Sequence, residues 1–316
     1  MNRTVSLQFR AMNTDVAVTV LAEPGRHAEA TSTVEDVKRW FDQVEATLSR
    51  FRPDSDLSHL NRCAGQTYAA TPMLCEVLGA ALAAAETTGG AFDPTVLPAL
   101  MAAGYDRSFE LLGAARATSG TAARPSGDWR AIDIDTARGT VRLPAGCAID
   151  LGGIGKGWAV DKAAERLAGF ACFAIDAGGD LCVRGSQASG APWTVGIQDP
   201  FDLDKDVLVL ALQDGAIATS STARRRWVHN GQAQHHIIDP RTGRPAATGV
   251  AAVTVIARSV ARCEALAKAA LVLGPIEGRL LLQQTDAEGL LILASGEVIA
   301  SSAAFGITPR PDIGSR

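Results

Sequence analysis

The sequence predicts an α+β fold with broad, largely antiparallel sheets flanked by helices. Short candidate strands, separated by glycines or polar turns, mix with helical segments and follow no regular strand–helix alternation. A doubly wound parallel sheet would require that alternation, and no internal repeat is visible. With 316 residues, the chain can bury roughly three quarters of its unfolded surface, so we expect 1–316 to form a single domain, or two intimate lobes.

The N-terminal part begins with a strand and two helices. The Val-rich stretch 15–22 alternates as a strand does, whereas 35–51 has apolar residues at helical spacing. Residues 71–90 predict a second helix, which starts at a Thr-Pro pair and stops at paired glycines. The small, polar segment 113–128 is punctuated by Pro and Gly, and we expect a flexible surface excursion there.

The rest of the chain alternates between short strands and two further helices. Residues 148–169 predict a strand that runs through a glycine-rich turn into a helix, and 262–274 predict a late, alanine-rich helix. The other candidate strands lie at 129–135, 140–144, 170–176, 181–185, 193–198, 207–212, 216–220, 250–257, 290–294 and 298–302.

Composition and charge exclude several classes of function. Hydrophobic content of 47% with 20% charge is ordinary for a soluble globular enzyme, and a net charge of -4 gives no basic surface for nucleic acid or anionic membrane. The one dense basic cluster, 224–226, is short enough to be a solvated loop or strand edge. Nowhere do about 18 apolar residues run together, so we expect no membrane-spanning segment.

The cysteines and the N-terminus favour a cytoplasmic location. The six cysteines show no CxxC or CxxH pairing, and a chain of this length needs no disulfides. The first residues lack the apolar run of about 7 to 15 residues that marks a signal peptide, and no early cysteine could carry a lipid. We therefore expect a cytoplasmic protein, unless a targeting segment was removed.

The stretch DLGGIGKGW, residues 150–158, is the most informative local feature. Its four glycines let backbone amides approach a ligand closely at the start of a helix, where the helix dipole favours anions. Lys156 adds a positive charge. The run matches neither the dinucleotide fingerprint nor a phosphate loop, so the residues alone leave phosphate binding and a tight structural turn equally open.

Two further turns carry polar residues. Phe92 and Asp93 follow a helix end and precede a proline, which a helix cap and an Asp-Pro turn would explain structurally. The stretch HHIIDPRTGRPA, residues 235–246, holds an imidazole at the end of a strand beside Asp239. A histidine can accept a proton near neutral pH, although a turn this rich in Asp, Pro and Gly can also be only a turn.

Eight motifs, in order along nearly the whole chain, resemble the ApbE family, the FAD:protein FMN transferases. They are AMNTDVAV, LSRFRPDSDLSHLN, TGGAFDPT, DLGGIGKGWAVDKA, FAIDAGGDLCVRG, WTVGIQDP, AIATSS and HHIIDPRTGRP. The resemblance implies a T-fold-related architecture with an elongated FAD pocket. It also implies that a Thr or Ser hydroxyl of a target flavoprotein attacks the FAD pyrophosphate, so that FMN becomes phosphodiester-linked to the target and AMP leaves.

The same resemblance assigns the site residues. His236 matches the catalytic histidine, which would take the proton of the attacking hydroxyl. The neighbouring Asp239 either orients this imidazole or serves only the structure of the turn. The positions that match FAD contacts are Met12, Phe51, Ala91, Phe92, Asp93, Asp150 and Lys156. The metal station falls on the carbonyl of Gly153 and the side chains of Glu264 and Lys268, and the family uses Mg²⁺ there.

This metal station departs from the family pattern. ApbE-like proteins usually carry an aspartate and, four residues later, a threonine or aspartate, where this chain has Glu264 and Lys268. Without the family register, the two would form an ordinary Glu–Lys pair worth about 0.2–0.5 kcal/mol on an exposed helix. A protonated lysine cannot ligate a cation, so we expect the Lys268 ammonium to stand where the metal would sit.

Two smaller departures concern the flavin end. The motif MNT replaces the usual methionine-glycine-threonine, and TSSTARRRW lacks the family's glycine and tyrosine, so Arg225, Arg226 or Trp227 could cover the isoalloxazine instead. Three functions stay open at this point: FMN transfer to a protein, FAD hydrolysis to FMN and AMP, and FAD binding without catalysis.

Overall fold

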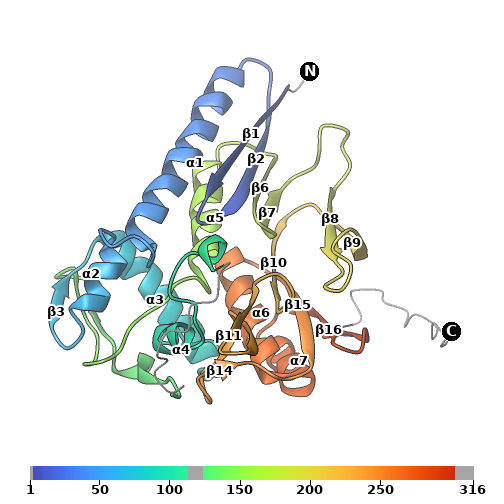
Figure 1. The fold of residues 1–316 in the computed structure, drawn as a ribbon. Helices are drawn as coiled ribbons and strands as arrows, with labels where there is room; N and C mark the ends of the chain where they lie inside the picture. Colours follow the sequence, from blue (N-terminus) through green and yellow to red (C-terminus); the bar gives the residue numbers. More distant parts are fainter. Residues whose placement is uncertain (1–2, 113–123, 303–316) are drawn as a thin grey trace.

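An eight-stranded, fully antiparallel sheet forms the centre of the molecule in the computed structural model, which describes residues 3–112 and 124–302 (Figure 1). Across the sheet, the strands lie in the order β1 (Arg3–Ala11), β2 (Thr14–Ala22), β6 (Phe173–Ala177), β7 (Asp180–Arg184), β10 (Gly215–Ser221), β15 (Val250–Ala257), β16 (Glu288–Leu293) and β17 (Val298–Ala300). This arrangement confirms the predicted α+β class with antiparallel sheets.

Helices pack on one face of this sheet. These are α1 (His27–Leu48), α5 (Gly155–Arg166), α6 (Val260–Leu273) and α7 (Pro275–Gln284). Helix α1 lies on β1 and β2, α6 lies on β10 and β15, and α5 packs between α1 and α6 (Figure 1). The two helices that carry the predicted site residues are therefore direct neighbours.

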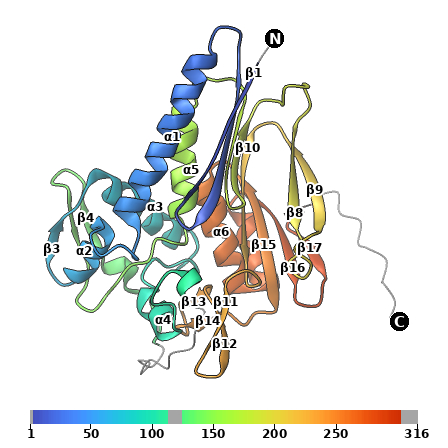
Figure 2. The ribbon, with the colours of Figure 1, turned by 45° about the horizontal axis from the view of Figure 1, so that its top comes forward.

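A hairpin of β8 (Trp193–Gln198) and β9 (Asp206–Leu212) packs on the opposite face (Figure 2). Strand β15 divides its side chains between the two faces, as a strand must. Val253 and Val255 join the main core with the helices, whereas Ala252 joins Ile197 of β8 in a second apolar cluster.

The remaining elements lie in the lower part of the view in Figure 1. They are α2 (Asp56–Arg62), α3 (Pro72–Thr87), α4 (Leu97–Ala102), the 3-10 helices η1 (Phe109–Leu111) and η2 (Asp128–Ala131), a three-stranded sheet of β3 (Thr67–Ala69), β5 (Thr140–Arg142) and β4 (Asp133–Asp135), and the short hairpins β11 (Arg226–His229) with β12 (Gln232–His235) and β13 (Ile238–Asp239) with β14 (Arg244–Pro245).

Several predicted elements are confirmed and others are corrected. Strand 15–22 corresponds to β2 and helix 71–90 to α3, whose Thr71 side chain caps the N–H of Leu74. Helix α1 begins earlier than predicted, at His27, because its first two turns bury few residues and give a weak apolar signal. Strand β1 and helix α7 were not predicted.

The strand predicted before the glycine-rich turn is wrong. Residues 147–150 form no regular element, because a side chain takes the place of a neighbouring strand. The amide of Asn61 accepts from the N–H of Ile149 at 2.7 Å and donates to its carbonyl at 2.9 Å. The main chain of Asp150 then donates to the carbonyl of Pro94 at 2.8 Å.

Part of the predicted excursion at 113–128 is described. Residues 113–123 lie outside the described residues, whereas the N–H of Ser126 donates to the carbonyl of Pro240 at 2.7 Å. Within the described part of the chain, no helix has the length and apolar character needed to cross a bilayer. All six cysteines are free thiols.

Candidate active site

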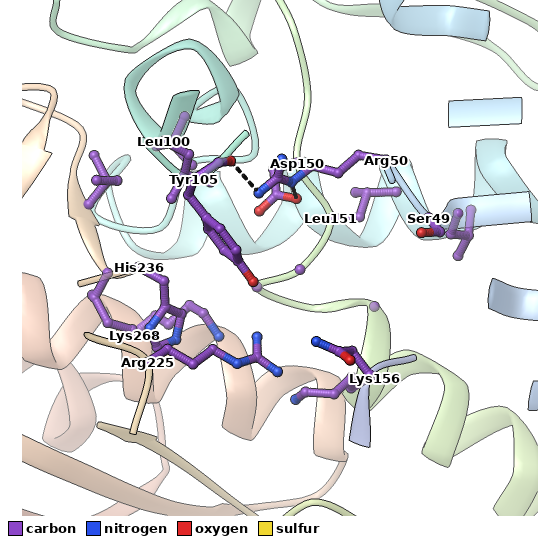
Figure 3. Close-up of a pocket in the computed structure, with 18 of the residues that line it drawn as sticks. Ser49, Arg50, Leu100, Tyr105, Asp150, Leu151, Lys156, Arg225, His236 and Lys268 are labelled. Carbon is purple, nitrogen blue, oxygen red and sulfur yellow. Dashed lines mark hydrogen bonds and ion pairs between the residues drawn. The ribbon is translucent and has the colours of Figure 1, made fainter. Parts of the chain in front are cut away.

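A cavity of about 260 Å³ opens where the end of α1, the start of α5 and the middle of α6 converge (Figure 3). All but one of the predicted site residues line it: Met12, Phe51, Ala91, Phe92, Asp93, Asp150, Gly153, Lys156, His236 and Lys268. Glu264 lies behind them and lines an adjoining groove. The fold thus brings all the predicted positions, which span most of the sequence, to one place.

The turn between β1 and β2 brings Met12 to the cavity. Met12 and Asn13 both adopt positive φ, at 50° and 62°. Asparagine is one of the few residues that tolerate this left-handed region, which explains why it can stand where the family usually has glycine. The Met12 N–H donates to Glu45 Oε2 at 2.6 Å, which fixes the turn against α1.

Aromatic rings and an arginine form one wall of the cavity. The Phe51 and Tyr105 rings lie 5.8 Å apart, and the Arg50 guanidinium covers both, at 4.1 and 4.6 Å from their centroids. Arg50 also pairs with Asp150 at 3.1 Å, which holds that carboxylate at the cavity edge. Sequence reasoning missed Tyr105, which no neighbouring motif marks.

The expectation for the flavin-covering residues is corrected in part. Trp227 stacks against Tyr105 at 5.3 Å and donates its indole N–H to the Ala103 carbonyl at 2.8 Å, so it supports the aromatic wall from behind. Arg225 does line the cavity, and its guanidinium has no ion pair or hydrogen bond among the described residues.

Asp93 presents an unsatisfied oxygen to the cavity. Its Oδ1 accepts from the N–H and the hydroxyl of Thr95, both at 2.7 Å, whereas the buried Oδ2 has no partner in the described chain. Burial raises the pKa of Asp93, against the opposing effect of the Thr95 hydrogen bonds. A buried polar atom without a partner is costly, so this oxygen is suited to a ligand donor.

A buried charge cluster lies at the junction of α5 and α6. Glu264 Oε1 is 3.1 Å from Lys156 Nζ and 3.3 Å from Lys268 Nζ, and Oε2 accepts from the Gly157 N–H at 2.9 Å. Lys156 also pairs with Asp180. Burial acts to raise the pKa of Glu264, but Lys156, Lys268 and the Gly157 N–H together lower it, which keeps the carboxylate ionised.

The two helices can place these groups together because they cross closely. A Cβ at Gly157 would lie 2.7 Å from the backbone of Val260, so only glycine allows this approach. Asp161 of α5 then caps α6 by accepting from the N–H groups of Val260 and Ala261 at 2.8 and 2.9 Å. Burial raises the pKa of Asp161 to about 6.

The residues at the predicted metal station do not fit a magnesium ion. Mg²⁺ requires oxygen ligands in octahedral geometry, but both oxygens of Glu264 already accept from nitrogen donors. The methylenes of Lys268 lie against Gly153, where an added Cβ would be 3.2 Å from Lys268 Cδ. Residues 3–112 and 124–302 contain no group of three His, Cys, Asp or Glu side chains that could hold a metal.

His236 lies between β12 and β13, on the side of the cavity that carries Arg225 and Lys268 (Figure 3). Its Nδ1 is buried and has no hydrogen-bond partner among the described residues. Burial, together with the nearby charges of Arg225 and Lys268, holds the pKa of His236 well below its usual value. The imidazole is therefore neutral at physiological pH and able to accept a proton.

The expectation that Asp239 orients this imidazole is wrong. Both Asp239 oxygens bind Arg241, at 3.0 Å to Nε and 3.0 Å to Nη2. The neighbouring His235 is also engaged elsewhere, because its Nε2 lies 3.0 Å from the Ala246 carbonyl oxygen. Of the two adjacent histidines, only His236 lines the cavity.

Comparisons with known proteins agree on one family. The sequence profile of the ApbE family matches residues 12–291. The FAD:protein FMN transferase of Treponema pallidum is 33% identical over 90% of this chain and 82% of its own length, and that of Vibrio cholerae is 27% identical over 96% and 92%. The ApbE protein of Thermotoga maritima superposes with a TM-score of 0.85 at 28% identity, covering 97% of this chain and 100% of that one. The flavin transferase ApbE of Vibrio cholerae gives 0.81 at 26% identity, covering 96% and 98%.

Proposed function

The chain belongs to the ApbE family, and we propose that it acts as an FAD:protein FMN transferase on a Thr or Ser hydroxyl of a partner flavoprotein. The hydroxyl oxygen forms a bond to the phosphorus of the FMN half of FAD. The bond from that phosphorus to the bridging oxygen breaks, and AMP leaves with this oxygen. The hydroxyl proton passes to His236, and the products are the FMN phosphodiester and AMP.

The position of the neutral His236 imidazole in the cavity wall, beside Arg225 and Lys268, carries this proposal. An alcohol is a poor nucleophile at neutral pH, so a base must take its proton as the attack develops. A neutral imidazole beside Arg225 and Lys268 provides that base where positive charge would attract the pyrophosphate. After the transfer, the imidazolium is placed to return a proton to solvent or to the leaving AMP.

Different parts of the cavity wall suit the two ends of FAD. Phe51 and Tyr105 offer aromatic faces to the isoalloxazine beside Met12, and the unpartnered Asp93 Oδ2 offers an acceptor to the adenosine. Flat aromatic contacts and a few polar groups are the usual way in which a pocket orients such a ligand.

We infer that Lys268 supplies charge in place of the divalent ion at this station. A bound Mg²⁺ would neutralise phosphate oxygens as charge moves to the leaving group. Here Lys156 and Lys268 pair with the carboxylates Glu264 and Asp180, and Arg225 adds a third cation, which leaves one net positive charge among these five groups. Lys268 is held by Glu264 and packed along Gly153, so its charge is positioned before FAD arrives.

The proposed function is tested by incubating the protein with FAD and a threonine peptide pool, which consists of short synthetic peptides with one central threonine and randomised flanks. We expect peptides that gain the mass of FMN, with one AMP released for each. Release of FMN and AMP without any peptide adduct would instead establish a hydrolase. Unchanged, bound FAD would establish a binding protein.

A further inference from the structure

A second cavity of about 540 Å³, here called the side groove, adjoins the candidate active site. Its walls are strand β8, the glycine turn between β6 and β7, and the C-terminal end of β10. Neither the FAD contacts nor the phosphate chemistry described above uses these walls, apart from the residues at the junction of the two cavities.

The junction of the two cavities coincides with the charged groups and the base. Six residues line both cavities: Asn13, Gly152, Lys156, Arg225, His236 and Lys268. A molecule lying in the side groove would therefore reach His236 without passing through the FAD cavity.

The geometry of phosphoryl transfer favours such a second entrance. The attacking and leaving oxygens must lie roughly in line on opposite sides of the phosphorus. The AMP half of FAD would depart toward the cavity lined by Ala91, Phe92 and Asp93. The attacking hydroxyl must then approach from the opposite side, where the side groove meets His236.

Strand β8 presents an unpaired edge to the side groove. The five consecutive residues from Thr194 to Gln198 all line it. Because successive side chains of a strand point to opposite faces, a groove touching five in a row must follow the backbone edge. Within the described residues β8 pairs with β9 alone, so its other edge has free N–H and C=O groups.

The loop after β8 carries exposed apolar side chains. Leu203 lines the side groove and is 50% exposed, and Phe201, two residues earlier in the same loop, is 58% exposed. Exposed apolar side chains next to a free strand edge are typical of a surface that binds another chain.

On the basis of the proposed function, we propose that the side groove binds the acceptor flavoprotein. An extended acceptor segment pairs with the free edge of β8 and delivers its Thr or Ser hydroxyl to His236. Pairing through the main chain gives affinity for many sequences, while the groove walls select among side chains. Leu203 then contacts an apolar side chain of this acceptor segment.

Tryptophan substitutions at two paired positions of the β8–β9 hairpin test whether the side groove binds the acceptor. Thr194 and Ala211 are cross-strand partners and both are exposed, but only Thr194 lines the side groove. Each variant is assayed with FAD and the threonine peptide pool, and FAD affinity is measured separately by the quenching of flavin fluorescence. Leu203→Ser provides a second, milder change at the outer end of the groove.

We expect Thr194→Trp to raise the KM for the peptide pool at least about tenfold and Leu203→Ser to raise it several-fold. Ala211→Trp should leave the KM for the peptide pool unchanged. All three variants should bind FAD with the affinity of the wild type. Unchanged peptide KM in Thr194→Trp, or an equal rise in Ala211→Trp, would overturn the side groove as the acceptor site. Absence of any adduct with the wild-type protein would overturn the proposed function, and this inference with it.

Discussion

The ammonium of Lys268 lies 3.3 Å from Oε1 of Glu264, one helical turn earlier on α6. On an exposed helix, a Glu–Lys ion pair at this spacing would stabilise the helix by only a few tenths of a kcal/mol. Here the Glu264 side chain is 2% exposed and also accepts from Lys156 and Gly157. The pair is therefore one part of a buried charge cluster that lies directly beside His236.

Removing the carboxylate should destabilise the fold. Glu264→Ala removes the shared partner of the half-buried Lys156 and Lys268, and breaking a buried ion pair typically costs about 3–5 kcal/mol. Glu165→Ala is the matched control, because Glu165 pairs with Lys162 at the surface and should matter by less than about 1 kcal/mol. Urea unfolding measures both, and equal losses would show that the cluster contributes no special stability.

Replacing Lys268 should reduce catalysis without creating a need for magnesium. Lys268→Met removes one positioned charge, and we expect FMN transfer to slow by about 100-fold. Added Mg²⁺ should not restore the rate, because methionine is no ligand for that ion. In contrast, the double variant Lys268→Thr with Glu264→Asp should gain magnesium-dependent FMN transfer. No gain would mean that this metal station differs from the family's in more than these two side chains.

Removing the base should abolish most of the transfer but not FAD binding. His236→Ala should slow FMN transfer by about 10²–10⁴-fold, which is the usual contribution of a general base. His235→Gln is the control, because His235 faces the Ala246 carbonyl and should tolerate the change. Comparable losses in both variants, or lost FAD affinity in His236→Ala, would assign His236 a structural role.

The pH dependence of transfer should report the depressed pKa of His236. Burial and the charges of Arg225, Lys268, His235 and Lys156 lower this pKa well below 6.5, so the imidazole stays neutral as the pH falls from 8 through 6.5. As the pH is lowered, kcat/KM should therefore begin to fall only below pH 6.5. Lys268→Met removes one of the charges that lower the pKa of His236, so in this variant the fall in kcat/KM should move toward pH 6.5. A wild-type midpoint at or above 6.5 would contradict this environment.

The close crossing of α5 and α6 should depend on one glycine. Gly157→Ala places a Cβ 2.7 Å from the Val260 backbone, and such overpacking typically costs about 1–3 kcal/mol. Gly79→Ala in α3 has no atom within 4 Å of its new Cβ and should instead stabilise by up to about 1 kcal/mol. Thermal unfolding distinguishes the two, and a neutral Gly157→Ala would mean that the helices can separate freely.

The sequence predicts the site residues well where one short motif contains both a turn and the reactive side chain beside it. The GGIGKG turn predicts the start of α5 and the place of Lys156, and HHIIDPRTG predicts a histidine at a strand end. Both signals are local, because four glycines within six residues and two adjacent histidines can each be recognised within one short stretch.

Features that depend on how the folded chain pairs its side chains could not be predicted. Tyr105 joins the aromatic wall only because Arg50 and Trp227, far from it in sequence, hold it there. Asp239 is bound by Arg241, two residues away, and only the folded turn shows that this pairing excludes His236. The side groove requires the edge of β8 to meet the end of β10, which no spacing in the sequence encodes.

The mass of the threonine peptides, after incubation with the protein, FAD and excess EDTA, shows whether Lys268 takes the place of a divalent ion in FMN transfer. We expect peptides that carry FMN, with an equal amount of AMP, at a rate that added Mg²⁺ barely changes. Free FMN and AMP without peptide adducts, or adducts that form only when Mg²⁺ is supplied, would contradict this expectation.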